Sequence, residues 1–322
     1  MMRALFAALA LASVAPAAAS SAPPVERNDY ANAGFSAAVS SGLRAFYRRE
    51  FKEAERAFER ALTAVPDNTF ALSFLTAAQA QQPGRLDVAT NLAEDAAIGA
   101  PKNYVDRIRL GFAYLFQSVT GRDRTLDARD EFNAAVALQP GAPAAHVGLG
   151  IMRFEERSAN RAKSEFLAAL RADPNNVLAR EYLGQLYQTD LRDPQRGLSY
   201  VIDVPNLVPQ YADIAFHIGS LLCDLHENDA ALKYLQRGID LDVEHVGEAG
   251  QHGYTLIARI EIERRQFAEA TKTLNVAIAS DVDTIYAKTL LQRIKAGDVP
   301  TPLPHGTTIP AEASPLAPSS PR

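Results

Sequence analysis

EAERAFERALTAVPDN, residues 53–68, carries alanines at positions 54 and 61, a phenylalanine at 58 and a proline at 66. Spacings of four and three residues bring Ala54, Phe58 and Ala61 to one face of a helix. Proline lacks the backbone N–H that a continuing helix needs, so Pro66 ends it. This stretch therefore predicts a helix followed by a turn, and it decides the fold because the same pattern recurs along the chain.

The recurrence has an interval of about 34 residues. Successive intervals of 35, 39, 34, 35, 34 and 39 residues separate the small residues Ala54, Ala89, Ala128, Ala162, Gly197, Ala231 and Ala270. Most units also carry a glycine upstream of that position, and these glycines are Gly42, Gly111, Gly150, Gly184 and Gly219. Each unit therefore predicts a helix A with the glycine inside it, a short turn, and a helix B. Small residues let two helices approach closely, while Phe58, Phe132 and Phe166 are expected to fill the space between neighbouring helices.

This arrangement resembles the tetratricopeptide repeat, a helix–turn–helix unit of about 34 residues. The resemblance covers residues 35 to 282 and implies an all-α, right-handed α-solenoid of about seven units with a C-terminal capping helix. The sequence departs from the family pattern in having no tryptophan. Ala77 and Ala258 also replace the glycine of helix A, and the fifth unit carries Gly197, Val201 and Val204 where Ala, Phe and Ala are typical.

The two ends of the chain differ in composition from the repeats. Residues 1–19 combine Arg3 with a short apolar run and an A-x-A pattern at Ala17 and Ala19, which is typical of a cleavable secretory signal; a disordered alanine-rich terminus is the alternative. Residues 299–322 hold seven prolines and predict a disordered tail. The expected organisation is a signal peptide at 1–19, a flexible linker at 20–34, the solenoid with its capping helix at 35–298, and the tail. The mature protein is expected in the periplasm or secreted, with no integral membrane segment.

Charge and motif content point away from nucleic acid and from catalysis. The formal net charge is −5, from 33 Lys and Arg against 38 Asp and Glu, whereas nucleic-acid binding needs a basic stripe. A single cysteine excludes an intramolecular disulfide. His245 and His252, with Glu244 and Glu248 nearby, could form a metal pair, but an exposed polar loop or helix start is the interpretation we adopt. His217 is expected to be isolated, and no enzyme activity, cofactor or metal is predicted.

The inner face of the array is the predicted partner site. In tetratricopeptide arrays the concave surface is lined mainly by helix A. The resemblance therefore implies an apolar and aromatic groove in the first four units, with partner-binding residues Val39, Leu43, Phe46, Tyr47, Phe74, Ile108, Phe112, Phe116, Ile151 and Phe154. The alternative is that half or more of these residues are core between repeats.

The function that this groove predicts is a non-catalytic scaffold or assembly factor of the cell envelope. It would bind a peptide or protein segment in the concave groove. The alternative is an accessory subunit of a polysaccharide-export or outer-membrane assembly machine.

Overall fold

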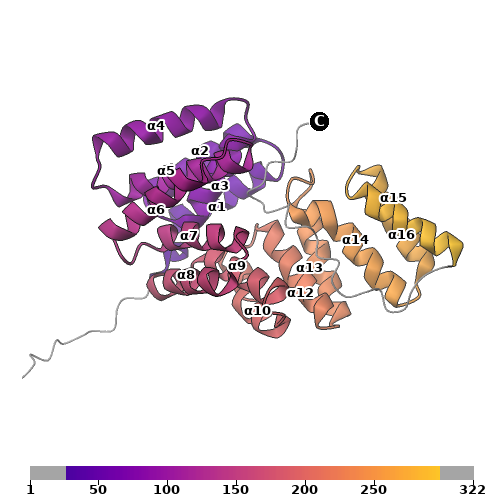
Figure 1. The fold of residues 1–322 in the computed structure, drawn as a ribbon. Coiled ribbons are helices and arrows are strands. Elements are labelled where there is room, and N and C mark those ends of the chain that lie inside the picture. Colours follow the sequence, from indigo (N-terminus) through magenta and orange to yellow (C-terminus); the bar gives the residue numbers. More distant parts are fainter. Residues whose placement is uncertain (1–26, 298–322) are drawn as a thin grey trace, which may run out of the picture.

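The structure is a computed structural model that describes residues 27–297. Over this range the chain is helical, with no β-strand (Figure 1). A short 3₁₀ turn, η1 (Asp29–Ala31), precedes sixteen α-helices. Their bounds are α1 (Ala33–Phe46), α2 (Phe51–Ala64), α3 (Thr69–Ala80), α4 (Arg85–Gly99), α5 (Tyr104–Val119), α6 (Thr125–Leu138), α7 (Pro143–Glu155), α8 (Ala159–Ala172), α9 (Val177–Thr189), α10 (Pro194–Val201), α11 (Val204–Leu207), α12 (Ala212–Asp224), α13 (Asn228–Leu241), α14 (Glu248–Glu263), α15 (Phe267–Ala279) and α16 (Thr284–Ala296).

The helices form about seven helix–turn–helix units, stacked one after another along the chain. The units are α1–α2, α3–α4, α5–α6, α7–α8, α9–α10, α12–α13 and α14–α15, and α16 packs on the last of them. Figure 1 shows the succession from the indigo helices of the first units to the yellow α16. The predicted all-α solenoid is confirmed, and a helix occupies the stretch that was expected to cap the array.

The recurring glycines accommodate the recurring phenylalanines. A Cβ atom added at Gly42 would lie 2.7 Å from the Cζ atom of Phe58, and one added at Gly150 would lie 2.5 Å from the Cε1 atom of Phe166. Both rings are fully buried. In the first, third and fourth units an aromatic ring of helix B fills the face of the glycine, while Val201 and Leu235 fill the faces of Gly184 and Gly219. This knob-and-socket contact joins the two helices of a unit.

Asparagine side chains start several of the A helices. Asn68 Oδ1 accepts a hydrogen bond from the backbone N–H of Ala71 at 3.0 Å, and Asn176 Oδ1 accepts one from Ala179 at 3.1 Å. Each bond satisfies a donor that the first helical turn leaves without an intrahelical partner. In the fifth unit, Asp193 caps α10 in the same way, as its place before a proline predicts. Helix B of that unit is then split into α10 and α11.

Residues 27–34, the part of the predicted linker that the structure describes, contact the first units. The Arg27 guanidinium lies 2.9 Å from Asp29 and 2.8 Å from Asp67, and α1 begins at Ala33 behind its cap Asn32. These ion pairs hold residues 27–34 against the first units. The predicted signal peptide at 1–19 and the tail at 299–322 lie outside the described residues.

The inner face of the first units is covered by later units of the same chain. Tyr47, at the end of α1, donates its hydroxyl to Asp213 of α12 at 2.9 Å, and its carbonyl accepts a hydrogen bond from Glu244 at 3.3 Å. Farther along the array, the ring of Phe70 in α3 lies 4.9 Å from that of Tyr211 between centroids. The A helices therefore fill the interior that a more open array would leave as a groove.

Candidate functional site

The ten predicted partner-binding residues are all core. Each of them exposes between 0 and 5% of its surface. They are buried because the first units close against the fifth and sixth, and because neighbouring A helices pack on one another. The expected exposed groove is therefore contradicted, and core packing between repeats accounts for these residues. Partner binding by these residues stays a prediction, and none of them offers an exposed side chain to a partner.

A buried ionisable cluster lies where the array closes. His217 of α12 was expected to be isolated, but its Nε2 atom lies 2.8 Å from Glu248 and its Nδ1 atom 3.1 Å from Glu181. Tyr211 donates its hydroxyl to the other oxygen of Glu181 at 2.5 Å. Burial alone would lower the pKa of His217, but the two carboxylates raise it well above its usual value, so the imidazole is held as a cation.

Two aspartates of this region cap the N-terminus of α14. Asp242 accepts hydrogen bonds from the backbone N–H groups of Val246, Gly247 and Gly250, while Asp213 accepts one from Ala249. Burial, together with the charges of Asp242, Glu248 and Glu181, raises the pKa of Asp213 to about 8.

The role that these contacts indicate is to hold units together. Within residues 27–297 no group of three or more His, Cys, Asp or Glu side chains could hold a metal ion.

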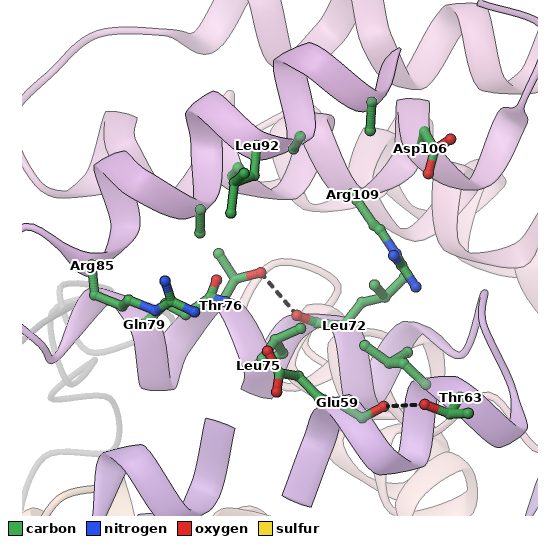
Figure 2. Close-up of a pocket in the computed structure, with 15 residues that line it drawn as sticks. Glu59, Thr63, Leu72, Leu75, Thr76, Gln79, Arg85, Leu92, Asp106 and Arg109 are labelled. Carbon is green, nitrogen blue, oxygen red and sulfur yellow. Dashed lines mark hydrogen bonds between the residues drawn. The ribbon is translucent and has the colours of Figure 1, made fainter. Parts of the chain in front are cut away.

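The candidate site is a pocket on the outer side of the second unit. Its volume is about 380 Å³, and it lies between α2, α3, α4 and α5 (Figure 2). Leu62 of α2 and Leu72 and Leu75 of α3 supply apolar lining. Other lining residues from these helices and α5 are Glu59, Thr63, Thr76, Gln79, Asp106, Arg109 and Ala113, and α4 contributes Arg85, Ala89, Leu92, Ala93 and Ala96.

The pocket lies in the unit that lacks an aromatic knob on helix B. Ala93 occupies the position that holds Phe58 in the first unit and Phe166 in the fourth, and Ala77 replaces the glycine socket. Without the ring, α4 makes little contact with α3 and packs mainly on α5. Leu86, Thr90 and Ala97 are the buried residues of α4. Ala93 lies at the edge of that buried face and lines the pocket together with Ala89, Leu92 and Ala96.

One end of the pocket is held by a buried carboxylate. Glu55 of α2 accepts hydrogen bonds from Gln79 at 3.2 Å, from Gln82 at 3.0 Å and from Arg85 Nε at 2.7 Å. Burial alone would raise the pKa of Glu55, but these donors hold it below its usual value. Arg85 is therefore neutralised by a partner within the protein and ties the start of α4 to α2.

Arg109 has a different environment. Its guanidinium points into the pocket from α5 (Figure 2). The side chain is exposed, and no hydrogen bond or ion pair joins it to another described residue. A positive charge at the edge of an apolar pocket is available to a ligand, by hydrogen bonding or by stacking on an aromatic ring.

Exposed apolar side chains continue from the pocket along α4. Leu92, at the rim, is 60% exposed, and Val88 and Ile98 are exposed on the same helix. Six of the ten large hydrophobic residues exposed within the described range lie between residues 88 and 138, the other three being Val119, Leu126 and Leu138. Exposed apolar side chains beside a pocket are typical of interaction surfaces.

Among the comparisons with known proteins, similar chains are found in solved structures. No family model matches the chain, and no curated protein matches it. Among solved structures, YrrB, described as a TPR protein with an unusual peptide-binding site, is 22% identical with a TM-score of 0.49; the match covers 63% of this chain and 100% of YrrB.

Two further structures are similar at the same level. A tetratricopeptide repeat protein from Parabacteroides merdae is 16% identical over 81% of this chain and 99% of its own, with a TM-score of 0.47. TTC0263 of Thermus thermophilus, a thermophilic TPR protein, is 19% identical over 59% of this chain and 99% of its own, with a TM-score of 0.42.

The chain's own repeats define its class. Stacked helical hairpins, each burying its apolar face against the next, make it a helical repeat solenoid. The length of the unit and the recurring glycine, alanine and phenylalanine positions make the repeat one of the tetratricopeptide type. None of the described helices is long and apolar enough to cross a membrane.

Proposed function

We propose that the chain is a non-catalytic interaction scaffold of the cell envelope, which holds a segment of a partner protein on the outer side of its second unit. The observation that carries the proposal is the open pocket between α2, α3, α4 and α5, continued by exposed apolar residues on α4. Solenoids of this class present extended surfaces to partners, and a sizeable pocket and exposed apolar side chains coincide in the second unit.

The envelope location rests on the sequence of residues 1–19. A basic residue, a short apolar run and an A-x-A pattern are the features that an export signal requires. The mature chain is then expected to begin near Ser20. Mass spectrometry of the protein from its native host tests this, since an intact Met1 in the cytosolic fraction would contradict export.

Affinity capture with matched variants tests the site. Leu92→Asp places a charge at the pocket rim, and Ile285→Asp places one on α16, where Ile285 is 84% exposed. Both side chains are exposed, so both variants are expected to fold like the wild type, which circular dichroism checks. We expect one protein of the envelope fraction to be captured by the wild type and by Ile285→Asp, and lost with Leu92→Asp. Equal capture by Leu92→Asp would place the partner surface elsewhere.

A further inference from the structure

The second unit is the exception in a series of filled positions. In the other six units the position equivalent to Ala93 carries a larger apolar side chain that is fully buried, and these residues are Phe58, Phe132, Phe166, Val201, Leu235 and Leu274. Each of them fills the space between its own helix B and the neighbouring helices. Ala93 leaves that space unfilled, and it lines the pocket.

We propose that this pocket receives a phenylalanine side chain from the partner protein, which supplies the knob that the second unit lacks. The inference rests on the proposed function, because it specifies the segment that the scaffold would hold. The volume is sufficient: an apolar cavity of about 150 Å³ holds a benzene molecule, whereas this pocket measures about 380 Å³. A phenyl ring with part of its backbone fits that space.

The lining favours an aromatic ring over an aliphatic side chain. Leu62, Leu72 and Leu75 supply an apolar contact surface, and the Arg109 guanidinium points into the pocket above it (Figure 2). A guanidinium over a ring face is attractive. The same array uses this contact elsewhere: the Arg124 guanidinium lies 4.0 Å from the centroid of the Tyr114 ring.

Charges around the pocket specify the residues that flank the phenylalanine. Arg85 is neutralised by Glu55, and Arg109 is proposed to stack on the phenylalanine ring of the partner. The lining carboxylates of Glu59 and Asp106 remain, and they repel an acidic segment. The partner segment is therefore a phenylalanine with neutral or basic neighbours.

A peptide selection on the full chain tests the inference. The probe is a displayed library of random twelve-residue peptides, selected on the wild type. Recovered peptides are then synthesised with their aromatic residue intact, replaced by leucine, and replaced by alanine. Binding is measured to the wild type and to Ala93→Phe, which fills the pocket from within. Asn91→Phe is the matched control, because it adds the same ring to α4 outside the pocket lining.

We expect the recovered peptides to carry phenylalanine with neutral or basic neighbours. Their affinity should fall at least tenfold with Ala93→Phe and stay unchanged with Asn91→Phe. Arg109→Gln should reduce the preference for phenylalanine over leucine by about two- to fivefold, the effect of one exposed cation–π contact. If Ala93→Phe does not fold, Ala96→Phe blocks the same pocket from an exposed position on α4.

The outcomes separate the two proposals. Peptides that bind Ala93→Phe as tightly as the wild type, or that lack an aromatic residue, would overturn the pocket inference and leave the scaffold function standing. A selection that recovers no peptide at all would contradict the proposed function, and the inference with it.

Discussion

The second and fourth units differ, among other positions, at the pair of residues that joins helix A to helix B, and we attribute the looser second hairpin to that pair. In the fourth unit, the ring of Phe166 on α8 fills the face of Gly150 on α7, and the two helices pack along their length. In the second unit, Ala93 and Ala77 stand at the equivalent positions, and α4 packs mainly on α5 and makes little contact with α3. The repeat therefore sets the succession of helices, while the aromatic knob sets how tightly the two helices of a unit are joined.

Removing the knob of the fourth unit should have the largest effect. Phe166 is fully buried, so Phe166→Ala removes a ring and leaves a cavity. We expect the free energy of unfolding to fall by about 3–5 kcal/mol, measured by urea denaturation. Leu92→Ala in the second unit is the control and should change stability by less than about 0.5 kcal/mol. A loss below about 1 kcal/mol for Phe166→Ala would mean that the fourth unit is not joined by its knob.

The inner faces of both units are buried where the first units pack against the fifth and sixth, through contacts such as Tyr47 to Asp213. We expect a rise in pH to weaken this packing. Asp213 has its pKa raised to about 8 by burial and by the charges of Asp242, Glu248 and Glu181, against 3.8 for an ordinary aspartate. The unfolded chain therefore loses this proton near pH 4, while the folded chain keeps it until about pH 8. The resulting stabilisation is complete below pH 4 and is lost as the pH rises through 8. His217 acts in the same direction because its pKa is also raised.

The expected decline in the free energy of unfolding between pH 5 and 9 is roughly 1–3 kcal/mol. Thermal unfolding at a series of pH values measures it. Asp213→Asn keeps an acceptor for the Ala249 N–H and cannot ionise, so it should flatten the profile. The account fails if wild type and Asp213→Asn show the same slope.

Adding a side chain at Gly150 should lower the free energy of unfolding by less than Phe166→Ala does. Gly150→Ala adds a methyl group where Phe166 leaves no room, and overpacking of this kind costs about 1–3 kcal/mol. Gly141→Ala is the matched control, because no atom lies within 4 Å of a Cβ added there. The difference between the two unfolding midpoints measures the tightness of the socket. Equal midpoints would contradict the knob-and-socket contact.

Giving the second unit its own knob should have the smallest effect, with the opposite sign. Ala77→Gly combined with Ala93→Phe recreates the pair of the fourth unit, and filling a cavity typically adds about 0.5–2 kcal/mol. The unfolding midpoint of the double variant should therefore rise above that of the wild type. A lower midpoint would show that α4 cannot return to α3 and that more than the knob separates the units.

The succession of helices could be predicted because each helix is specified by residues that are close together in the sequence. The spacing of Ala54, Phe58 and Pro66 places one helix face and its end, and the interval between its recurrences counts the units. The close contact at Gly42 and Gly150 follows from the same pattern. The ring that fills each glycine is four residues beyond the alanine on helix B, a detail that the helical period allows but does not single out.

The closure of the inner face could not be predicted in the same way. Tyr47 and Asp213 are 166 residues apart, and the repeat pattern does not state how far successive units rotate. The ten groove residues, Phe112 and Phe154 among them, have the same apolar character whether they line a groove or fill a core. His217 illustrates the same point, because its carboxylate partners come from α9 and α14.

The sequence shows the two substitutions that accompany the pocket but not the pocket itself. Ala77 in place of glycine is a departure that the repeat reveals, and Ala93 in place of phenylalanine is visible by the same comparison. The sequence does not determine whether α4 packs closely on α3 or packs on α5 and leaves a pocket. That outcome depends on the bonds that tie α4 to α5, such as Tyr114 to Glu94 at 2.7 Å and Gln117 to Asp87 at 3.0 Å.

Amide hydrogen exchange, followed helix by helix, tests the difference between the two units most directly. Helices that lack buried contacts open at low free-energy cost, so the amides of α4 should exchange at least tenfold faster than those of α8. The Ala77→Gly, Ala93→Phe double variant should slow α4 and leave α8 unchanged. Equal protection of α4 and α8 in the wild type would contradict the claim that the missing knob leaves the second unit open.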